Sequence, residues 1–106
     1  MGDVVYKDKF IWDAQKAELN LKKHRVRFET AAAVFSDPFL IEEYDRENST
    51  SEDRFNVTGS VTGLASHVLV TVSVTYRGGF IRVFSARRAE AVEAGDYYDQ
   101  FRQYLR

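Results

Sequence analysis

A stretch from Val68 to Tyr76, in which valine alternates with other residues, constrains the fold of this chain more than any other segment. Valine occupies every second position up to Val74, and Leu, Thr and Ser occupy the positions between. Side chains of a β-strand alternate between two faces, so the pattern predicts a strand with one buried face. Gly78–Gly79 is a strong hairpin signal, and residues 80–85 are expected to return as the partner strand.

The N-terminal part predicts a strand followed by a helix. Phe10–Trp12 is a short aromatic run of the kind found in strands. Asp13 is a good N-cap, and apolar residues recur at helical spacing from Ala14 to His24. We expect the helix to end near His24 with Arg25 in the left-handed conformation, because no glycine is available there.

A second, alanine-rich helix is predicted from Glu29 to Phe35. Arg27 stands where Ser, Thr or Asp usually caps a helix, so this N-terminus lacks a side-chain cap and could offer its backbone donors to a phosphate or carboxylate. Asp37–Pro38 should stop the helix. Strands are then expected to begin at residues 39–41 and to span residues 54–62, on either side of an acidic loop.

The C-terminal part predicts a turn at residues 63–66, a short helix at 86–93 and a closing helix at 96–106. The closing helix carries aromatic residues at helical spacing, which form either core or a docking face for a partner. With 106 residues, the chain has room for one domain. We therefore predict a single α+β domain, residues 1–106, with two N-terminal helices on a four-stranded antiparallel sheet and a C-terminal helix.

Charge is segregated along the chain, although the net charge is only −1. Two basic blocks, Lys22 to Arg27 and Arg77 to Arg88, alternate with acidic segments at 42–53 and 90–99. Such segregation can give a nearly neutral protein one face that attracts anions, although solvated surface charge explains it equally well. No apolar run suits a membrane span, no signal-peptide pattern opens the sequence, and the absence of cysteine suits a cytoplasmic protein.

The residue types argue against several kinds of catalytic site. The two histidines, His24 and His67, lie far apart with no metal-binding spacing, and no nucleophile elbow or phosphate-binding glycine loop is present. RNA cleavage without a metal needs fewer groups from the protein, because the substrate's 2′-hydroxyl is the nucleophile. The protein supplies a base, an acid for the leaving group and cations for the phosphate. Lys23, His24 and Glu29 could transfer protons while arginines hold the phosphate, although a lone histidine is more often structural.

The spacing of these residues resembles the BrnT family of type II toxins, which is related to the RelE ribonuclease fold. The likeness covers about residues 10–89. Its N-terminal signature is carried by Trp12, Asp13, Lys16, Asn20, Lys23, His24, Val26, Phe28, Glu29, Ala31, Val34, Phe35, Asp37 and Pro38. Its middle and C-terminal signatures are carried by Glu52, Arg54, Gly59, Thr75, Arg77, Ile81, Arg82, Ser85, Ala86, Arg87 and Ala89.

The resemblance implies a ribonuclease toxin with a RelE-like fold and no cofactor or metal. It also implies inhibition by a BrnA-like antitoxin with a ribbon-helix-helix part. The toxin would contact operator DNA only through this antitoxin. The implied catalytic residues are Lys23, His24, Glu29, Arg54, Arg77 and Arg82. Arg87 and Lys22 would be further substrate contacts. Glu29 or His24 would be the base, and Lys23 or His24 the acid.

The chain also departs from the family pattern. Arg25 and Arg27 make the helix corner more basic, whereas the segment from Glu90 to Asp96 replaces an arginine-rich tail helix with an acidic one. The loss of cations weakens the electrostatic part of nucleic-acid affinity. Two alternatives therefore stay open: a non-catalytic module that binds the antitoxin, and a structural protein whose basic face binds another macromolecule.

Overall fold

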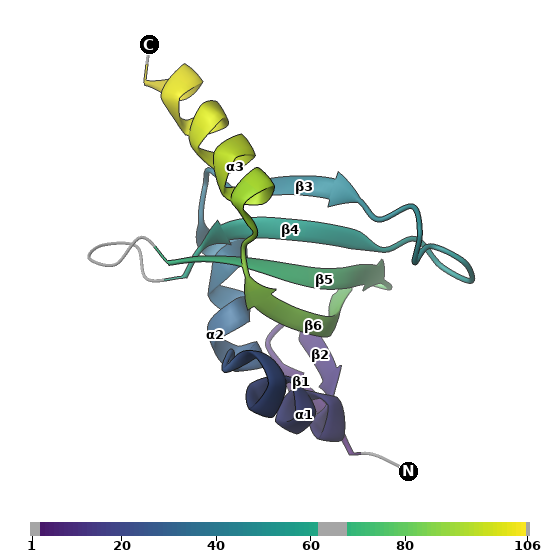
Figure 1. The fold of residues 1–106 in the computed structure, drawn as a ribbon. Coiled ribbons are helices and arrows are strands. Elements are labelled where there is room, and N and C mark those ends of the chain that lie inside the picture. Colours follow the sequence, from purple (N-terminus) through teal and green to yellow (C-terminus); the bar gives the residue numbers. More distant parts are fainter. Residues whose placement is uncertain (1–2, 62–67, 106) are drawn as a thin grey trace.

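The sheet is the centre of the fold in the computed structural model, which describes residues 3–61 and 68–105 (Figure 1). Its six strands have the order β1-β2-β6-β5-β4-β3 within these residues. The strands are β1 (Val4–Lys7), β2 (Phe10–Asp13), β3 (Ile41–Tyr44), β4 (Phe55–Ser60), β5 (Leu69–Arg77) and β6 (Phe80–Arg88). The helices are α1 (Ala14–His24), α2 (Phe28–Ala32), the 3-10 helix η1 (Ala33–Ser36) and α3 (Ala91–Tyr104).

The α+β class is confirmed, but the four-stranded antiparallel sheet is wrong in detail. β1 was not predicted, because its side chains are mostly exposed and show no alternation. It forms a hairpin with β2, and β2 then pairs with β6 in parallel, so the sheet is mixed. The sequence pattern identifies strands but carries no signal for a parallel partner about 70 residues away. The turn expected at residues 63–66 and His67 lie outside the described residues.

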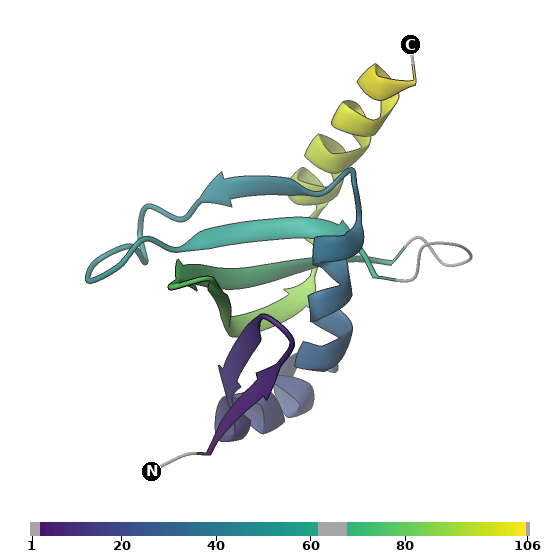
Figure 2. The ribbon, with the colours of Figure 1, turned by 180° about the vertical axis from the view of Figure 1, so that it is seen from behind.

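The central hairpin is confirmed. Gly78 and Gly79 both have positive φ, 58° and 86°, which favours glycine at the two turn positions. The valines of β5 are buried, as the alternation predicts, and they pack under α2 and η1. Figure 2 shows α2 lying across this face of the sheet, which therefore holds the core.

A β-bulge at Phe84 reverses the alternation of β6. Val83 pairs with Val74 and Ser85 pairs with Ser73, so Phe84 has no partner on β5. Arg82 and Arg87 are five positions apart, and a regular strand would place them on opposite faces. The extra residue brings both arginines to one face.

The face opposite the core is rich in polar residues, and we call it the polar face. Its polar members on β4, β5 and β6 follow from the register and are Asn56, Thr58, Ser60, Thr71, Ser73, Thr75, Arg77, Arg82, Ser85 and Arg87. α1 and α3 lie at its two ends in Figure 1, opposite the side on which α2 packs.

α1 is attached to β6 by the buried side chain of Asn20. β2 pairs with β6 only at Ile81 and Arg82, so the later part of β6 has no strand on that side. The Asn20 amide takes the place of a strand: its Oδ1 accepts from the Ala86 N–H at 3.1 Å, and its Nδ2 donates to the Ala86 carbonyl at 2.9 Å. The same Nδ2 donates to the Val26 carbonyl at 2.9 Å, which fixes the turn into α2.

The ends of α1 agree with the sequence. The Asp13 carboxylate accepts from the backbone N–H groups of Gln15 and Lys16, and Arg25 has a φ of 61°. α2 begins at Phe28, one residue earlier than expected, and continues as η1 to Ser36. Arg27 precedes α2 without a side-chain cap, as predicted.

The C-terminal helix begins earlier than expected. Residues 86–88 continue β6, so the short helix predicted at 86–93 is wrong, and α3 starts at Ala91 with a capping box between Glu90 and Glu93. Gly95 lies inside α3. The capping box has Glu at the position usually held by Ser or Thr, which explains why the sequence did not reveal this start.

We expect Asn20→Leu to lower the free energy of unfolding by about 3 kcal/mol, because the buried N–H and C=O of Ala86 would lose their partners. Urea denaturation followed by circular dichroism measures the change. Gln15→Ala, which removes an exposed amide from the same helix, is the control and should have little effect. Equal stability of Asn20→Leu and the wild type would contradict the role given to Asn20.

Candidate active site

The floor of the polar face is built from hydroxyl groups that are themselves hydrogen-bonded. The buried hydroxyls of Thr58 and Thr71 lie 2.6 Å apart on neighbouring strands. Because Thr71 donates its proton to the Glu93 carboxylate at 2.9 Å, Thr58 must be the donor to Thr71. Thr75 donates to the Asp53 carbonyl at 2.6 Å. These bonds fix the strands beneath the charged side chains.

Three cations from separate elements surround the ring of Phe84. The Arg54 guanidinium carbon, just before β4, lies 3.9 Å from the ring centroid. Lys16 Nζ of α1 lies at 5.7 Å, and the Arg82 guanidinium carbon of β6 lies at 6.0 Å. We call Lys16, Arg54 and Arg82 the cation cluster. Positive charge gathered on a polar face suits an anion such as a phosphodiester.

Arg87 lies on the same face but is paired with Glu93 of α3. Its two terminal nitrogens donate to the two Glu93 oxygens at 2.8 and 2.9 Å. The hydrogen bond to Glu93 raises the pKa of Arg87 further above its usual value. Burial alone would raise the pKa of Glu93, but hydrogen bonds from Arg87, the Glu90 N–H and Thr71 lower it. The pair therefore stays ionised and anchors α3 to β6.

Arg77 lies at the hairpin end of β5 and is paired with Glu52 of the acidic loop. Its neighbour Tyr76 donates to Glu42 at 2.5 Å, and burial together with this bond raises the pKa of Tyr76. These contacts attach the acidic loop to β5 and add a side-chain bond between β5 and β3. Arg77 therefore contributes less uncompensated charge than the sequence suggested.

The other predicted catalytic residues lie near the corner between α1 and α2. Lys23 is exposed and His24 is half-buried in the last turn of α1, while Glu29 is exposed in the first turn of α2. Within residues 3–61 and 68–105, no hydrogen bond or ion pair joins them to Arg54 or Arg82. Their convergence with the arginines stays a prediction.

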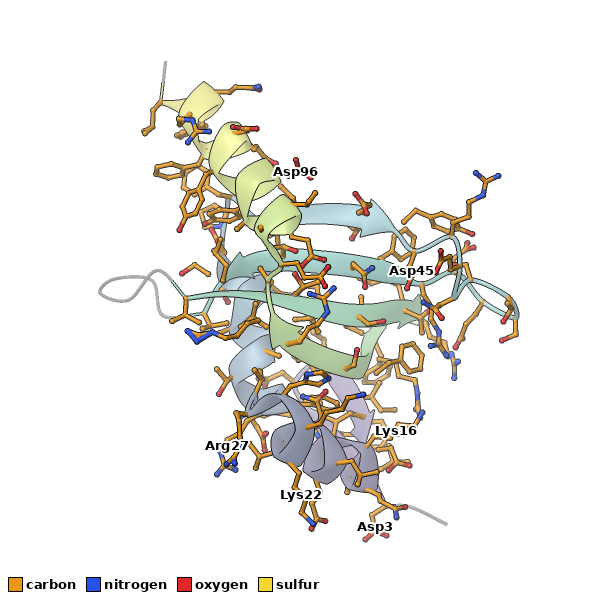
Figure 3. All side chains as sticks on the ribbon, viewed as in Figure 1. Asp3, Lys16, Lys22, Arg27, Asp45 and Asp96 are labelled. Atoms are coloured by element: carbon orange, nitrogen blue, oxygen red, sulfur yellow. The ribbon has the colours of Figure 1, made fainter. Side chains whose placement is uncertain are left out.

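Two further basic residues of the corner lie apart from the cation cluster. Lys22 forms an exposed ion pair with Glu18 at 3.8 Å, and Figure 3 shows it pointing away from the sheet. Figure 3 also shows Arg27 on the other side of the corner from Lys16. Lys22 and Arg27 therefore do not form one continuous patch with Lys16.

Three residues of this face were not predicted as site residues. Lys16 could have been found, because it shares a helical face with Asn20 and Lys23. Phe84 could also have been found, because alternation along the predicted strand places it on the same side as Arg82. Glu93 was placed in a separate short helix, away from the arginine that it binds.

An apolar cavity of about 460 Å³ lies between η1, the ends of β4 and β5, and α3, and its lining does not include the cation cluster. The carboxylate of Asp37, which lines this cavity, accepts hydrogen bonds from the Ser60 N–H at 2.8 Å and from the Tyr97 hydroxyl at 2.6 Å. Burial and this bond raise the pKa of Tyr97. Phe101 of α3 packs edge-on against Phe39, with centroids 4.8 Å apart. Asp37 is thus a structural residue that holds α3.

No cluster of three or more His, Asp or Glu side chains suited to a metal ion occurs among the described residues. In the same part of the chain, no helix is both long and apolar enough to span a bilayer.

Comparison with known proteins gives one family. The model of the family described as "Ribonuclease toxin, BrnT, of type II toxin-antitoxin system" matches residues 12–93, well over half of the chain. The match begins at Trp12, before α1, and ends at Glu93, in the first turn of α3, so it includes the whole cation cluster. No curated protein matches the chain.

We expect Glu93→Gln to lower the free energy of unfolding by about 2 kcal/mol at neutral pH, because Arg87 would lose its charged partner. The pKa of Glu93 is lowered from its ordinary value of 4.5, so its contribution is complete above that pH and is lost as the pH falls through the folded-state pKa. Wild type and variant should therefore converge in urea denaturation as the pH falls below the folded-state pKa. Asp96→Asn, at an exposed position of α3, is the control; a pH-independent difference for Glu93→Gln would contradict the assignment.

Proposed function

Because this chain belongs to the BrnT family of ribonuclease toxins of type II toxin–antitoxin systems, we propose that it is a metal-independent endoribonuclease of the mRNA-interferase kind. The observation that carries the proposal is the cation cluster on the polar face, where Arg54 and Arg82 meet at one ring with Lys16 beside them. Arginine suits a phosphodiester because its planar fork donates two parallel hydrogen bonds to phosphate oxygens.

The proposed reaction uses the nucleophile of the substrate. A base removes the proton of the 2′-hydroxyl of the RNA. The 2′-oxygen then bonds to the adjacent phosphorus. The bond from phosphorus to the 5′-oxygen breaks, and an acid protonates that oxygen. The products are a 2′,3′-cyclic phosphate and a 5′-hydroxyl end, so no metal-bound water is needed.

We assign the proton transfers to the corner between α1 and α2. Glu29 or His24 is the base, and Lys23 or His24 is the acid. Arg54, Arg77 and Arg82 stabilise the charge that develops on the phosphate oxygens. Lys22 and Arg87 are assigned to contacts with the rest of the RNA. Arg87 would keep Glu93 as a partner while it does so, because Glu93 holds α3 to the sheet.

Membership in a type II system implies a protein antitoxin. We propose that this antitoxin is BrnA-like, with a ribbon-helix-helix part that alone contacts operator DNA. Since the proposed substrate is RNA and the proposed repressor complex contacts operator DNA, we also propose a cytoplasmic location.

We expect the purified protein to cleave single-stranded RNA in the presence of EDTA. Lys23→Ala and Arg82→Ala should each lower the cleavage rate ~100-fold, because one removes a proton-transfer group and the other a charge that stabilises the transition state. The rate is measured on a labelled oligoribonucleotide under single-turnover conditions.

Arg46→Ala is the matched control, since Arg46 is an exposed arginine in the acidic loop. It should leave the rate unchanged. If Lys23→Ala and Arg82→Ala both retain full cleavage, the catalytic assignment is wrong.

One observation favours a second function. Arg77 and Arg87 are each paired with a carboxylate of the same chain, and α3 is acidic where an arginine-rich helix was expected. This reduces the charge available for RNA. The alternative is therefore a non-catalytic, toxin-like module that binds the antitoxin and supports its repression of the operon.

Growth distinguishes the two functions. We expect expression without the antitoxin to arrest growth and to lower total RNA, because a free ribonuclease degrades cellular transcripts. Growth curves and RNA yields measure this, with the Arg82→Ala protein as the control. Normal growth and unchanged RNA at equal expression of soluble wild-type protein would favour the binding module.

A further inference from the structure

Phe84 lies two positions after Arg82, so strand alternation places its ring on the polar face with that arginine. It is the residue of β6 without a partner on β5, and its side chain is half-buried. The Arg54 guanidinium carbon lies 3.9 Å from the ring centroid. It is closer to the ring than Lys16 Nζ or the Arg82 guanidinium carbon. This is a cation–π contact at short range.

The backbone of Arg54 is fixed independently of its side chain. Its N–H donates to the Ser49 hydroxyl at 2.8 Å, and its carbonyl accepts from the Asp45 N–H at 2.8 Å. The side chain has fewer restraints: within the described residues it forms no ion pair, and its Nε is buried without a hydrogen-bond partner. The guanidinium instead lies against the Phe84 ring.

Arg54, Arg77 and Arg87 therefore differ in which group contacts the guanidinium. Carboxylates hold Arg77 and Arg87, and each carboxylate compensates the positive charge that it orients. An aromatic ring holds Arg54 without compensating its charge. An anion that reaches the polar face thus meets in Arg54 a cation that is both oriented and uncompensated.

We propose that Phe84 is a positioning residue, which orients Arg54 to bind a phosphodiester oxygen of single-stranded RNA. This inference rests on the proposed function, since it takes RNA as the ligand. Phe84 itself supplies no charge and no proton. Its effect reaches the RNA through Arg54 alone.

Binding of a short single-stranded 2′-O-methyl RNA tests the proposal, because this probe lacks the 2′-hydroxyl needed for cleavage. Phe84→Leu should weaken affinity about fivefold. It should also make the plot of log K against log salt concentration less steep by about 0.7, the contribution of one phosphate contact on a single strand. A purely structural role of Phe84 would leave this slope unchanged, since Phe84→Leu removes no charge.

Three further variants isolate the path through Arg54. In an Arg54→Gln background, Phe84→Leu should cause no further loss, because the residue that it orients is gone. Phe84→Tyr keeps a ring and should restore both affinity and slope. Phe80→Leu removes a ring from the same strand, one that contacts Tyr6, and should change neither.

The outcomes separate this inference from the proposed function. A wild-type protein that does not bind the RNA probe would overturn both. A wild-type protein that binds, together with a folded Phe84→Leu variant of equal affinity and slope, would overturn the role of Phe84 alone. Circular dichroism of each variant establishes that it is folded.

Discussion

The position of α1 on the sheet depends on one side chain, Asn20. Its amide reproduces the hydrogen bonds of a missing strand on Ala86, and its second proton fixes the carbonyl of Val26 at the turn into α2. Lys16, Asn20 and Lys23 share one face of α1, so the bonds of Asn20 also orient the two lysines. Lys16 lies one turn earlier, beside Phe84, and Lys23 lies one turn later along the same helix. A residue with no chemical role in catalysis thus sets the geometry of the basic residues beside it.

The bulge at Phe84 has an equally large effect on β6. Beyond the bulge, alternation continues with the opposite phase, so Ala86 enters the core with no exposed surface and Arg87 reaches the polar face. Without the extra residue, Arg87 would point into the valine-rich core, where a charged group is costly. Ser85 of the family signature lies opposite Ser73, directly after the bulge. The fixed spacing between Arg82 and Arg87 is therefore consistent with a bulged strand and not with a regular one.

Local signals were enough to predict much of the fold. The Asp13 cap, the left-handed Arg25 and the Gly78–Gly79 turn each depend on the chemistry of one or two residues, and all three are present. The parallel pairing of β2 with β6 depends on tertiary contacts, and so does the bulge, which is why neither was predicted. The candidate site follows the same division. Residue spacing and family resemblance pointed to Arg54 and Arg82, and alternation places Phe84 beside Arg82, whereas the contact of Arg54 with the Phe84 ring depends on the pairing of β4, β5 and β6.

Pairing in space explains how a nearly neutral chain can hold a concentrated positive site. The acidic segments are distant from the basic blocks in sequence, yet Glu52 reaches Arg77 and Glu93 reaches Arg87. Among the described residues, no carboxylate forms an ion pair with Lys16, Arg54 or Arg82. The acidic loop and α3 therefore compensate Arg77 and Arg87 and leave the cation cluster without a paired carboxylate among the described residues. Such a distribution favours an anion bound at the cation cluster over one spread across the whole surface.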